Sequence, residues 1–431
     1  MDYQEALNYI NDKNKFGSRL GLERIERLLE LLGNPHMDLK CIHIAGTNGK
    51  GSTASYIATV LKEAGYKTGL FTSPYLERFN ERISINGEDI PDERLAEITE
   101  RVKNSIDIML EEGYTHPTTF EIVTAIGFVY FREENTDYVV LEVGLGGRLD
   151  STNVIRESLI SVITTIDYDH MDVLGDTLAK IAYEKAGIIK DNGLVLTYPQ
   201  AEEALNTIRE VAEKRGATLE VCPMENVEIL RLDESGGAFN YRYNGKYYDN
   251  LEISLIGKHQ VFNATLALTA LVMLKDRGMV DISEEALRRG LKNTKWPGRL
   301  EVFKRNPLFI IDGAHNIQGI RVLRENIDRF NYRRLILGIG ILKDKEVEPM
   351  VRALVDKADE VVVTEANIYR KMDAEDLERI IKRYNTHTHV RKSLREAVSK
   401  AYELADGEDL ILFTGSLYLI GDIRKMVLGN N

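Results

Sequence analysis

The stretch GTNGKGST at residues 46–53 gathers the residue types that bind phosphate. It follows the apolar run 41–45 and precedes a segment whose apolar residues recur at spacings of three and four, as on an amphipathic helix. In such a strand–loop–helix unit, backbone N–H groups and the helix N-terminus surround phosphate oxygens, and Lys50 would reach the outer phosphates. Gly51 separates Lys50 from Ser52 and so departs from the usual G-x-x-x-x-G-K-[ST] spacing. The stretch predicts a nucleotide phosphate site; the alternative is a glycine-rich turn without chemistry.

A carboxylate stands inside a second apolar run. Glu142 interrupts VVLEVGLGG (139–147), and an unpaired buried carboxylate is costly. Mg²⁺ prefers hard oxygen ligands of this kind. Glu142 is therefore a candidate magnesium ligand, the alternative being one half of a structural salt bridge.

Three further potential ligands, Asp167, Asp169 and His170, lie at or just beyond the end of the run 159–167. Sheets of α/β proteins place ligand groups at such strand ends. A lone histidine is more often a satisfied loop residue, but three potential ligands within four residues favour a functional cluster.

Lys185 lies among small apolar residues in IAYEKAGII (181–189), where helical spacing puts it near the buried face. A buried lysine that keeps its charge is expensive. It either pairs with Glu184 or another acid, or reacts as a neutral amine with CO₂ to form a carbamate. The residues alone leave these alternatives open.

The elements that must position these residues are short apolar runs, each followed by a helix-like segment. The runs 41–46, 67–72, 137–145, 159–167 and 193–198 lack strict alternation, which is typical of parallel strands buried on both faces. The stretch 217–256 alternates more and contains SGG and NG turns, which predicts an antiparallel excursion. A second series of runs occupies 308–314, 334–341, 360–366 and 409–415.

The fold class is therefore α/β, with a mostly parallel P-loop domain over 1–295 and a smaller Rossmann-like domain over 296–431. The chain's one Trp, at 296, marks the boundary. The 431-residue length suits two or three domains, and a cleft between domains is a common ligand site.

Composition narrows the class of partner. A net charge of −12 argues against nucleic acid, whose phosphates are held by clustered basic residues. The two distant cysteines, Cys41 and Cys222, indicate no disulfide framework, and a reducing cytoplasm is expected. Residues 1–15 read as a polar amphipathic helix rather than a signal segment, and no apolar run is long enough for a membrane span.

Ten motifs together carry a resemblance to a known family. The chain closely resembles folylpolyglutamate synthase and its bifunctional form, dihydrofolate synthase, within the Mur ligase superfamily. The motifs occur in this order: GTNGKGST (46–53), TSPYLERFNERISING (72–87), TTFEIVTAIGF (118–128), LEVGLGGRLDSTNVI (141–155), DHMDVLGDT (169–177), IAYEKAGIIK (181–190), GKHQVFNATLAL (257–268), WPGR (296–299), DGAHN (312–316) and GSLYLIG (415–421).

The resemblance implies an ATP-dependent carboxylate–amine ligase. The γ-phosphate of ATP activates a substrate carboxylate as an acyl phosphate, and the amine of L-glutamate then attacks it. The implied substrates are reduced folate and dihydropteroate, with Mg²⁺, two ions in the family pattern, neutralising the charge. ATP is expected in the interdomain cleft, in a monomer.

The resemblance also assigns residues. For ATP these are Asn48, Gly49, Lys50, Gly51, Ser52, Asn263, Arg299, Asp312 and His315, with Asn316 as a neighbour. Ser73, Glu142 and His170 match magnesium ligands, and Lys185 matches a lysine that is carbamylated in relatives, so Lys50, Glu142, His170 and Lys185 are the expected catalytic set. For the pterin they are Thr118, Thr119, Phe120, Glu121, Leu149, Asp150 and Ser151, and Ser416 is a candidate for the incoming glutamate.

The aspartate in RLDSTN, Asp150, resembles the bifunctional bacterial enzymes. Tyr75 departs from the S-P-H-L pattern of relatives, which questions a role for a histidine there but not the role of Ser73. His387 and His389 read as a solvated strand end rather than a metal pair.

Three alternatives compete with this assignment. The first is an enzyme without the synthase activity that acts on folates alone. A cell-wall Mur ligase would need a UDP-sugar-binding N-terminal domain, for which 45 residues before the loop leave little room. A regulatory protein on a degenerate scaffold would be expected to lose Lys50, Glu142, His170 or Lys185, and all four are present.

Overall fold

The computed structural model describes residues 1–12 and 21–429, which fall into two compact units. The first unit comprises 1–230, 238–253 and 260–294, and the second comprises 231–237, 254–259 and 295–431. The units are thus discontinuous, whereas the sequence analysis divides the chain at one point. The predicted helix 1–15 is described as α1 (Tyr3–Asp12), and its residues 13–15 lie outside the described residues.

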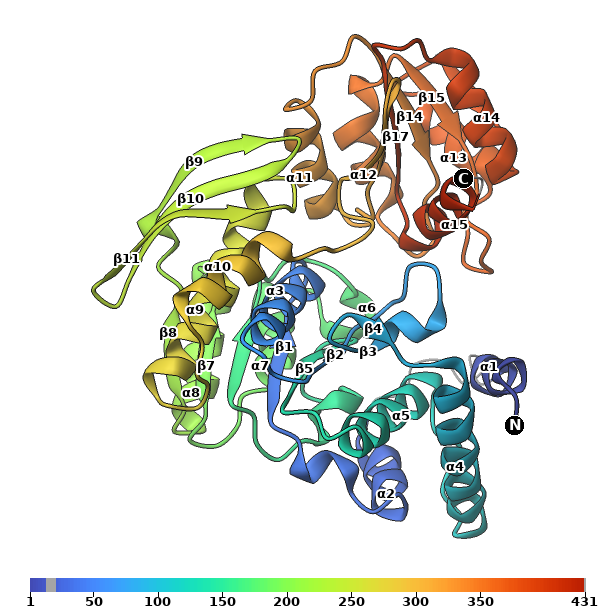
Figure 1. Cartoon of the computed structure of the whole chain (residues 1–431). Helices are drawn as coiled ribbons and strands as arrows, with labels where there is room; N and C mark the ends of the chain where they lie inside the picture. Colours follow the sequence, from blue (N-terminus) through green and yellow to red (C-terminus); the bar gives the residue numbers. More distant parts are fainter. Residues whose placement is uncertain (13–20, 430–431) are drawn as a thin grey trace. The chain divides into compact units, whose positions relative to one another are not determined.

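The first unit is built on an eight-stranded sheet in the order β4-β3-β2-β5-β1-β6-β7-β8 (Figure 1). The sheet is parallel from β2 to β8, and β3 and β4 add an antiparallel edge. Each of the five predicted runs forms one of its parallel strands. The strands are β1 (Cys41–Ala45), β2 (Thr68–Phe71), β3 (Ile83–Ile85), β4 (Glu88–Asp89), β5 (Tyr138–Glu142), β6 (Ile160–Ile163), β7 (Leu194–Thr197) and β8 (Thr218–Val221).

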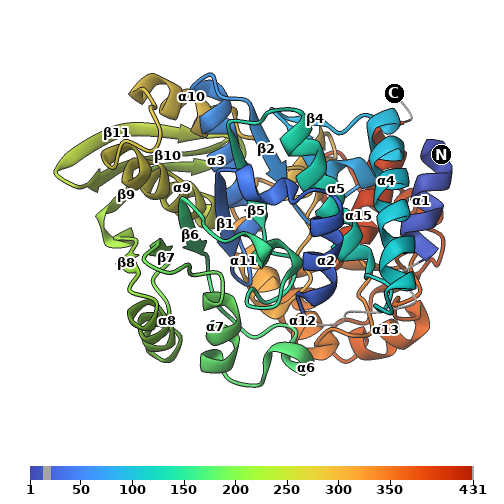
Figure 2. The ribbon, with the colours of Figure 1, turned by 90° about the horizontal axis from the view of Figure 1, so that it is seen from below.

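Helices cover this sheet because their apolar residues need burial. α3 packs on β1, β2 and β5, and α7 packs against α8 and α6, which Figure 2 shows side by side. The helices of this part are α2 (Glu23–Leu31), α3 (Lys50–Glu63), α4 (Asp92–Glu111), α5 (Thr119–Glu133), α6 (Met171–Leu174), α7 (Leu178–Ala186), α8 (Glu202–Lys214), α9 (Lys258–Asp276) and α10 (Glu284–Asn293).

A separate three-stranded sheet has the order β11-β10-β9, formed by β9 (Val227–Asp233), β10 (Gly236–Tyr243) and β11 (Lys246–Ile253). Two-residue connections join the consecutive strands, which only antiparallel neighbours allow. The predicted excursion is confirmed from residue 227 onward. It is wrong for 217–221, because these residues form β8 and pair in parallel with β7.

The second unit contains a six-stranded sheet in the order β12-β13-β17-β14-β15-β16. The four predicted runs form β13, β14, β15 and β17, and the antiparallel edge strand β12 was not predicted. The elements are β12 (Glu301–Arg305), β13 (Leu308–Ile311), α11 (Ile317–Ile327), β14 (Leu335–Ile339), α12 (Val347–Leu354), β15 (Glu360–Val363), α13 (Ala374–Ile381), β16 (Thr388–Val390), α14 (Leu394–Leu404), β17 (Leu410–Thr414) and α15 (Leu417–Leu428).

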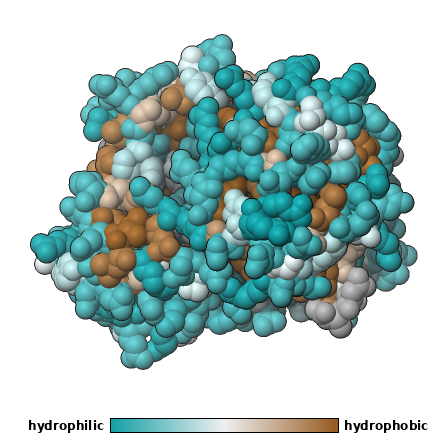
Figure 3. All heavy atoms as spheres, turned by 90° about the horizontal axis from the view of Figure 1, so that it is seen from above, coloured by the Kyte–Doolittle hydropathy of each residue, from teal (hydrophilic) through white to brown (hydrophobic). Residues whose placement is uncertain are grey.

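The surface drawn in Figure 3 is covered mostly by hydrophilic side chains, with smaller apolar areas between them. Among the described residues, no helix is both long and apolar enough to cross a membrane. Cys41 and Cys222 are buried free thiols. His389 lies in β16 and contacts the Glu360 carboxylate at 2.8 Å, while Nδ1 of His387 lies 3.1 Å from the Asp359 carbonyl.

Candidate active site

Four chain segments leave the carboxyl ends of adjacent strands in the first unit. In sheet order they follow β2, β5, β1 and β6. Ser73, the 46–49 loop and His170 lie in the segments after β2, β1 and β6, and Glu142 is the last residue of β5. The register pairs Ile44 with Glu142 and Ala45 with Ile163, so these strands end at one edge. Residues up to 124 positions apart, from Gly46 to His170, are therefore gathered where parallel sheets bind ligands.

The 46–49 loop turns sharply between β1 and α3. Gly49 is the N-cap of α3 with φ +85°, a left-handed conformation that favours glycine. It has no side chain to cap the helix, and the first N–H groups of a helix have no partner within it. A Cβ on Gly49 would lie 2.6 Å from Oδ1 of Asn263, so the loop also packs tightly against α9. Donors in the first turn of α3 can thus serve an anion.

Hydroxyl groups from the segment after β6 hold this loop. Thr164 and Thr165 donate to the Asn48 carbonyl at 2.7 and 3.2 Å. Thr47 donates its hydroxyl to the Asp167 carbonyl and accepts the Asp167 N–H, both at 3.0 Å. The candidate ligand Asp167 is thereby tied to the loop through its backbone. Sequence reasoning missed Thr164 and Thr165, although two hydroxyl residues directly after a buried strand were a usable signal.

The first turn of α3 carries Lys50, Gly51 and Ser52. Nζ of Lys50 donates to the Thr47 carbonyl at 3.2 Å, which folds this side chain back over the loop. Gln260 donates to the buried Ser52 hydroxyl at 3.2 Å and accepts from the Asn263 amide at 3.2 Å. The predicted residues Ser52 and Asn263 are thus brought together by Gln260, which sequence reasoning did not identify.

Glu142 is 5 % exposed at the end of β5. Its carboxylate accepts the N–H of Ser73 at 3.4 Å, so two of the three predicted magnesium ligands are in direct contact. His170 lies in the segment after β6 with φ +51° as the N-cap of α6, and its Nε2 is 3.9 Å from a carboxylate oxygen of Asp169. Hydroxyl, carboxylate and imidazole groups lie near one sheet edge.

Lys185 is 4 % exposed on α7, as helical spacing predicted. Its Nζ donates to the Gly46 carbonyl at 2.7 Å. It is not paired with Glu184, whose carboxylate instead accepts from Arg148 at 2.9 Å. Burial lowers the pKa of the Lys185 amine to about 7, with the Lys50 charge acting in the same direction and Asp169 and Asp150 opposing it. A large fraction of this amine is therefore neutral near pH 7.

The segment 144–154 after β5 carries three of the predicted pterin residues, Leu149, Asp150 and Ser151. Oδ2 of Asp150 accepts the N–H groups of Gly144 and Leu145 at 3.0 and 2.9 Å. Oδ1 accepts the N–H and the hydroxyl of Thr152 at 3.0 and 2.6 Å. Burial raises the pKa of this carboxyl, and the four donors oppose the shift. Asp150 therefore fixes the conformation of the segment.

The other predicted pterin residues begin α5. Thr118 is its N-cap and forms a capping box with Glu121: Thr118 N–H donates to the carboxylate at 2.6 Å, and Glu121 N–H donates to the Thr118 hydroxyl at 3.3 Å. Arg24 pairs with the same carboxylate at 3.1 Å. The Thr119 hydroxyl donates to the Ile10 carbonyl, and the Phe120 ring lies where a Cβ on Gly144 would be. Phe120 thus joins this turn to the 144–154 segment.

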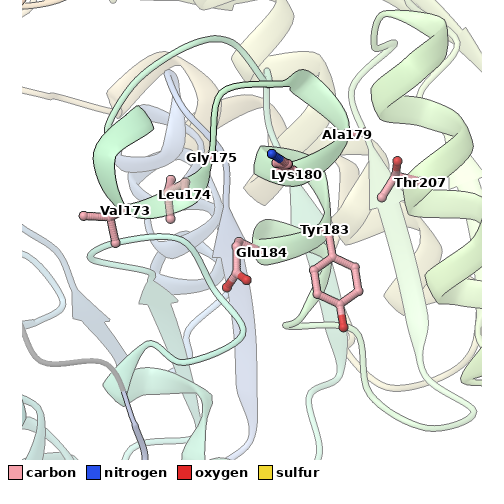
Figure 4. A pocket seen from close by; sticks show the side chains of 8 residues that line it. All are labelled: Val173, Leu174, Gly175, Ala179, Lys180, Tyr183, Glu184 and Thr207. Atoms are coloured by element: carbon pink, nitrogen blue, oxygen red, sulfur yellow. The ribbon is translucent and has the colours of Figure 1, made fainter.

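α7 is connected to the same segment along its C-terminal turn. Arg148 N–H donates to the Glu184 carbonyl at 2.7 Å, and Asn153 donates to the Gly187 carbonyl at 3.1 Å. Lys190 donates to the Asn153 side chain at 2.8 Å. Beside Glu184 is a pocket of about 450 Å³ between α6, α7 and α8, lined by Tyr183, Lys180 and Thr207 among others (Figure 4). No predicted site residue lines this pocket.

The second unit holds its own group of predicted residues after β13. Asp312 is buried and accepts the N–H groups of Leu300 and Ala314 at 2.9 and 2.8 Å. Burial raises the pKa of its carboxyl, and the Arg299 charge opposes this. Burial also lowers the pKa of His259 to about 4, in the same direction as the Arg299 charge. Nδ1 of His315 contacts the Gly313 carbonyl at 2.8 Å, and Asn316 caps α11.

Ser416 is the N-cap of α15 and is 1 % exposed. Its hydroxyl has no hydrogen-bond partner among the described residues, and Gly415 before it has φ +109°. A buried hydroxyl without a partner at a helix N-terminus is suited to an anionic ligand such as a carboxylate.

Two family models match the chain. The Mur ligase middle domain matches residues 44–271, and the Mur ligase glutamate ligase domain matches residues 298–417. The chain is 41 % identical to a Bacillus subtilis dihydrofolate synthase/folylpolyglutamate synthase, over 98 % of each chain.

Solved structures are similar over almost the whole length. A Mycobacterium tuberculosis folylpolyglutamate synthase complexed with ADP matches with a TM-score of 0.91 and 30 % identity, over 99 % of each chain. E. coli FolC in complex with DHPP and ADP matches with a TM-score of 0.87 and 28 % identity, over 100 % of this chain and 98 % of that one.

Proposed function

The chain belongs to the Mur ligase family, and from this premise we propose that it joins L-glutamate to the carboxylate of a reduced folate with ATP as co-substrate. It is an ATP-dependent ligase of the folylpolyglutamate synthase and dihydrofolate synthase type. The observation that carries the proposal is the sheet edge at which the 46–49 loop, Glu142, Ser73 and Lys185 are joined by hydrogen bonds or lie on adjacent strands.

The reaction has two steps, and in both of them negative charge on the substrates must be neutralised. A carboxylate oxygen of the folate attacks the γ-phosphorus of ATP, so that an acyl phosphate forms and ADP leaves. The glutamate amine then attacks the acyl carbon, phosphate leaves and the amine proton passes to solvent. N–H groups in the first turn of α3 and the Lys50 ammonium would hold the phosphates, and positioning rather than a protein nucleophile accounts for the rate.

The residues at the sheet edge fit a magnesium ion. Glu142 is a nearly buried carboxylate that accepts the Ser73 N–H at 3.4 Å, a long contact, and the Ser73 hydroxyl and His170 imidazole complete a donor set of the kind that magnesium binds. Magnesium bound there would neutralise negative charge on the phosphates. Ser73, Glu142 and His170 are proposed to hold it, with a second ion nearer Lys185.

Lys185 is proposed to be carbamylated. Its amine is buried beside the phosphate loop with a pKa of about 7, and a carbamate nitrogen keeps one N–H for the Gly46 carbonyl. The neutral amine adds to CO₂ and releases one proton, so that an anionic carbamate replaces a neutral amine. Because only the neutral amine reacts, carbamate formation should increase as the pH rises through about 7. Carbon-13 NMR with labelled CO₂ should show one protein carbamate signal that Lys185→Met lacks; a wild-type protein without the signal contradicts the proposal.

The pterin is proposed to contact Thr118 to Glu121 and Leu149 to Ser151, and the aspartate at 150 favours dihydropteroate as a second acceptor. Asn263, Arg299, Asp312 and His315 are proposed to contact ATP, and Ser416 to contact the incoming glutamate. The orphan hydroxyl of Ser416 supports the last assignment.

We propose a cytoplasmic monomer without nucleic-acid or membrane partners; the net charge of −12 supports the first of these exclusions. Light scattering coupled to size exclusion tests the monomer, because a dimer elutes at twice the mass of the 48.9 kDa chain.

The deciding experiment is ATP-dependent phosphate release with Mg²⁺ and L-glutamate, with dihydropteroate and tetrahydrofolate in separate reactions and mass analysis of the products. Glutamate addition to both acceptors is the expected result. Addition to tetrahydrofolate alone removes the synthase assignment and leaves the ligase mechanism. No product from either acceptor, in protein that binds ATP, overturns the folate assignment.

A further inference from the structure

His43 lies in the middle of β1 and is fully buried. β1 is flanked by β5 and β6, and its five residues are all buried. Central parallel strands normally carry apolar side chains here, because a buried imidazole must lose its hydration. Burial lowers the pKa of His43 well below its ordinary value, so the ring is neutral. A histidine at this position needs a specific partner.

That partner is Thr152. Nε2 of His43 lies 2.8 Å from the Thr152 hydroxyl oxygen, and this hydroxyl lies 2.6 Å from Oδ1 of Asp150. Three backbone N–H groups also point at the Asp150 carboxyl, which favours the ionised form as an acceptor. The single hydroxyl proton of Thr152 therefore goes to Asp150.

The direction of the remaining bond follows. Since the Thr152 proton is used, its oxygen accepts from His43, and the ring carries its proton on Nε2. Nδ1 is then an acceptor, and it has no hydrogen-bond partner among the described residues. The ring thus leaves one buried nitrogen without a hydrogen bond while it donates from the other. A side chain that only filled space would not carry this cost.

The chain His43–Thr152–Asp150 connects the centre of the sheet with the segment after β5. Through Oδ2, Asp150 holds Gly144 and Leu145, which follow Glu142 by two and three residues. Through Oδ1 it holds the turn Ser151–Val154. The donor on β1 thereby fixes Thr152 and, with it, both ends of a segment that contains no strand or α-helix of its own.

We propose that His43 is a positioning residue for the pterin-bearing substrate, acting through Thr152 on Asp150 and the 144–154 segment. This rests on the proposed function, because it assumes that Leu149, Asp150 and Ser151 face the pterin. His43 lies two residues before the end of β1, and the 46–49 loop is held instead by Thr164 and Thr165. Loss of the His43 donor should therefore weaken binding of the pterin substrate more than binding of ATP.

Two matched pairs of variants test this in the full-length enzyme. His43→Leu removes the donor of the His43–Thr152 bond, and Thr152→Val removes its acceptor. His43→Gln keeps a side-chain N–H and Thr152→Ser keeps a hydroxyl, so each of these two variants can still form the bond. The KM for tetrahydrofolate should rise about tenfold or more in the first two, since one bond in a charge-assisted chain is lost. The KM for ATP should stay within about twofold, and the Gln and Ser variants should recover most of the difference.

Ile42→Val, a neighbouring buried residue of β1, controls for stability loss alone. Equal rises in the KM values of all substrates, or an unchanged folate KM in Thr152→Val, overturn the proposal. Should His43→Leu fail to fold, the Thr152 pair decides.

Nitrogen-15 NMR of the wild-type imidazole gives a readout that does not depend on the reaction. A neutral ring protonated on Nε2 is expected, and a ring protonated on Nδ1 overturns the chain of bonds. If the wild-type protein has no ligase activity but its ring is protonated on Nε2, and if Thr152→Val changes that signal, the proposed function is contradicted. The hydrogen-bond chain then still stands.

Discussion

Two glycine-rich segments follow neighbouring strands of the same sheet, and they use their backbone in opposite ways. The first, 46–51, contains Gly46, Gly49 and Gly51 after β1; the second, 144–147, contains Gly144, Gly146 and Gly147 after β5. In the first, side chains of another segment bind a backbone carbonyl, that of Asn48. In the second, the carboxylate of Asp150 takes the N–H groups of Gly144 and Leu145.

The difference shows that glycine content alone does not make an anion site. In the first segment the Thr47 N–H donates to the Thr165 carbonyl at 2.7 Å, but the side-chain anchors bind carbonyls and leave the N–H groups of the first helical turn for a ligand. The segment leads into a 14-residue helix whose dipole favours negative charge. A loop whose N–H groups are bound by its own carboxylate has a fixed shape but little capacity for phosphate. The first segment is suited to hold a nucleotide, and the second is suited to present side chains.

The largest expected effect comes from a substitution in the first segment, 46–51. Lys50→Ala removes the cation that is proposed to reach the outer phosphates and should lower kcat/KM by about 10²- to 10³-fold, as for loss of a group that stabilises developing charge. Lys62→Ala, an exposed position near the end of the same helix, is the matched control and should be near wild type. Steady-state phosphate release measures both. Comparable losses in the two variants would mean that the effect comes from the helix rather than from the phosphate contact.

A substitution in the second segment should lower the stability of the folded protein. Asp150→Ala leaves three backbone N–H groups without their acceptor and should reduce the free energy of unfolding by about 2–4 kcal/mol, because each unpaired buried donor is costly. Asp150→Asn keeps one acceptor oxygen and should lose less. Urea unfolding followed by circular dichroism gives both values. A stable Asp150→Ala protein would show that the segment does not depend on this carboxylate.

A smaller effect concerns the lysine beside the first segment. The folded-state pKa of Lys185, about 7, is below its unfolded value, so between these values the unfolded chain holds a proton that the folded chain lacks. Stability of the unmodified protein in CO₂-free buffer should therefore rise with pH above 7, by up to about 1.4 kcal/mol per pH unit. Lys185→Met should lack this contribution. Urea titrations at several pH values compare the two slopes, and equal slopes would contradict the depressed pKa.

The smallest expected effect concerns the two threonine hydroxyls that donate to the Asn48 carbonyl. Thr165→Val removes the longer of two hydroxyl contacts to the Asn48 carbonyl, and Thr164 remains. The Kd for ATP should rise only about two- to fivefold, in keeping with one shared neutral hydrogen bond. Thr165→Ser keeps the hydroxyl and should be unchanged in calorimetric titration. A much larger loss would show that Thr164 alone cannot hold the loop.

The fold was predictable to the extent that it is local. The runs that form β1, β5 and β6 are buried throughout and mostly apolar, and this pattern specifies parallel strands with covering helices. The strands that were missed, β3, β4 and β12, are two to five residues long and paired antiparallel. β4 and β12 are edge strands with exposed residues, and β3 is three buried residues, too few to show a pattern. β8 was misread because polar and apolar residues alternate along Thr218–Val221, as in the hairpin strands that follow it.

Prediction of the site has the same limit. Residue types drew attention to Glu142 and Lys185, because a charge within an apolar run stands out in one dimension, and to Lys50, because it lies in a glycine-rich loop between a strand and a helix. Gln260, Thr164 and Thr152 were missed, since a neutral polar residue gives no signal until its partner is known.

The sequence by itself determined the strand–loop–helix unit around 46–53 and the burial of Lys185, since both follow from periodicity along the chain. Only the tertiary structure decided what Lys185 contacts: Gly46, 139 positions away, rather than its neighbour Glu184. It also decided that Asp150 serves the backbone of its own segment and that His43 donates to Thr152. Sequence spacing fixes which face a side chain lies on, whereas the partner on that face depends on which strands become neighbours, and that is settled by packing of the whole sheet.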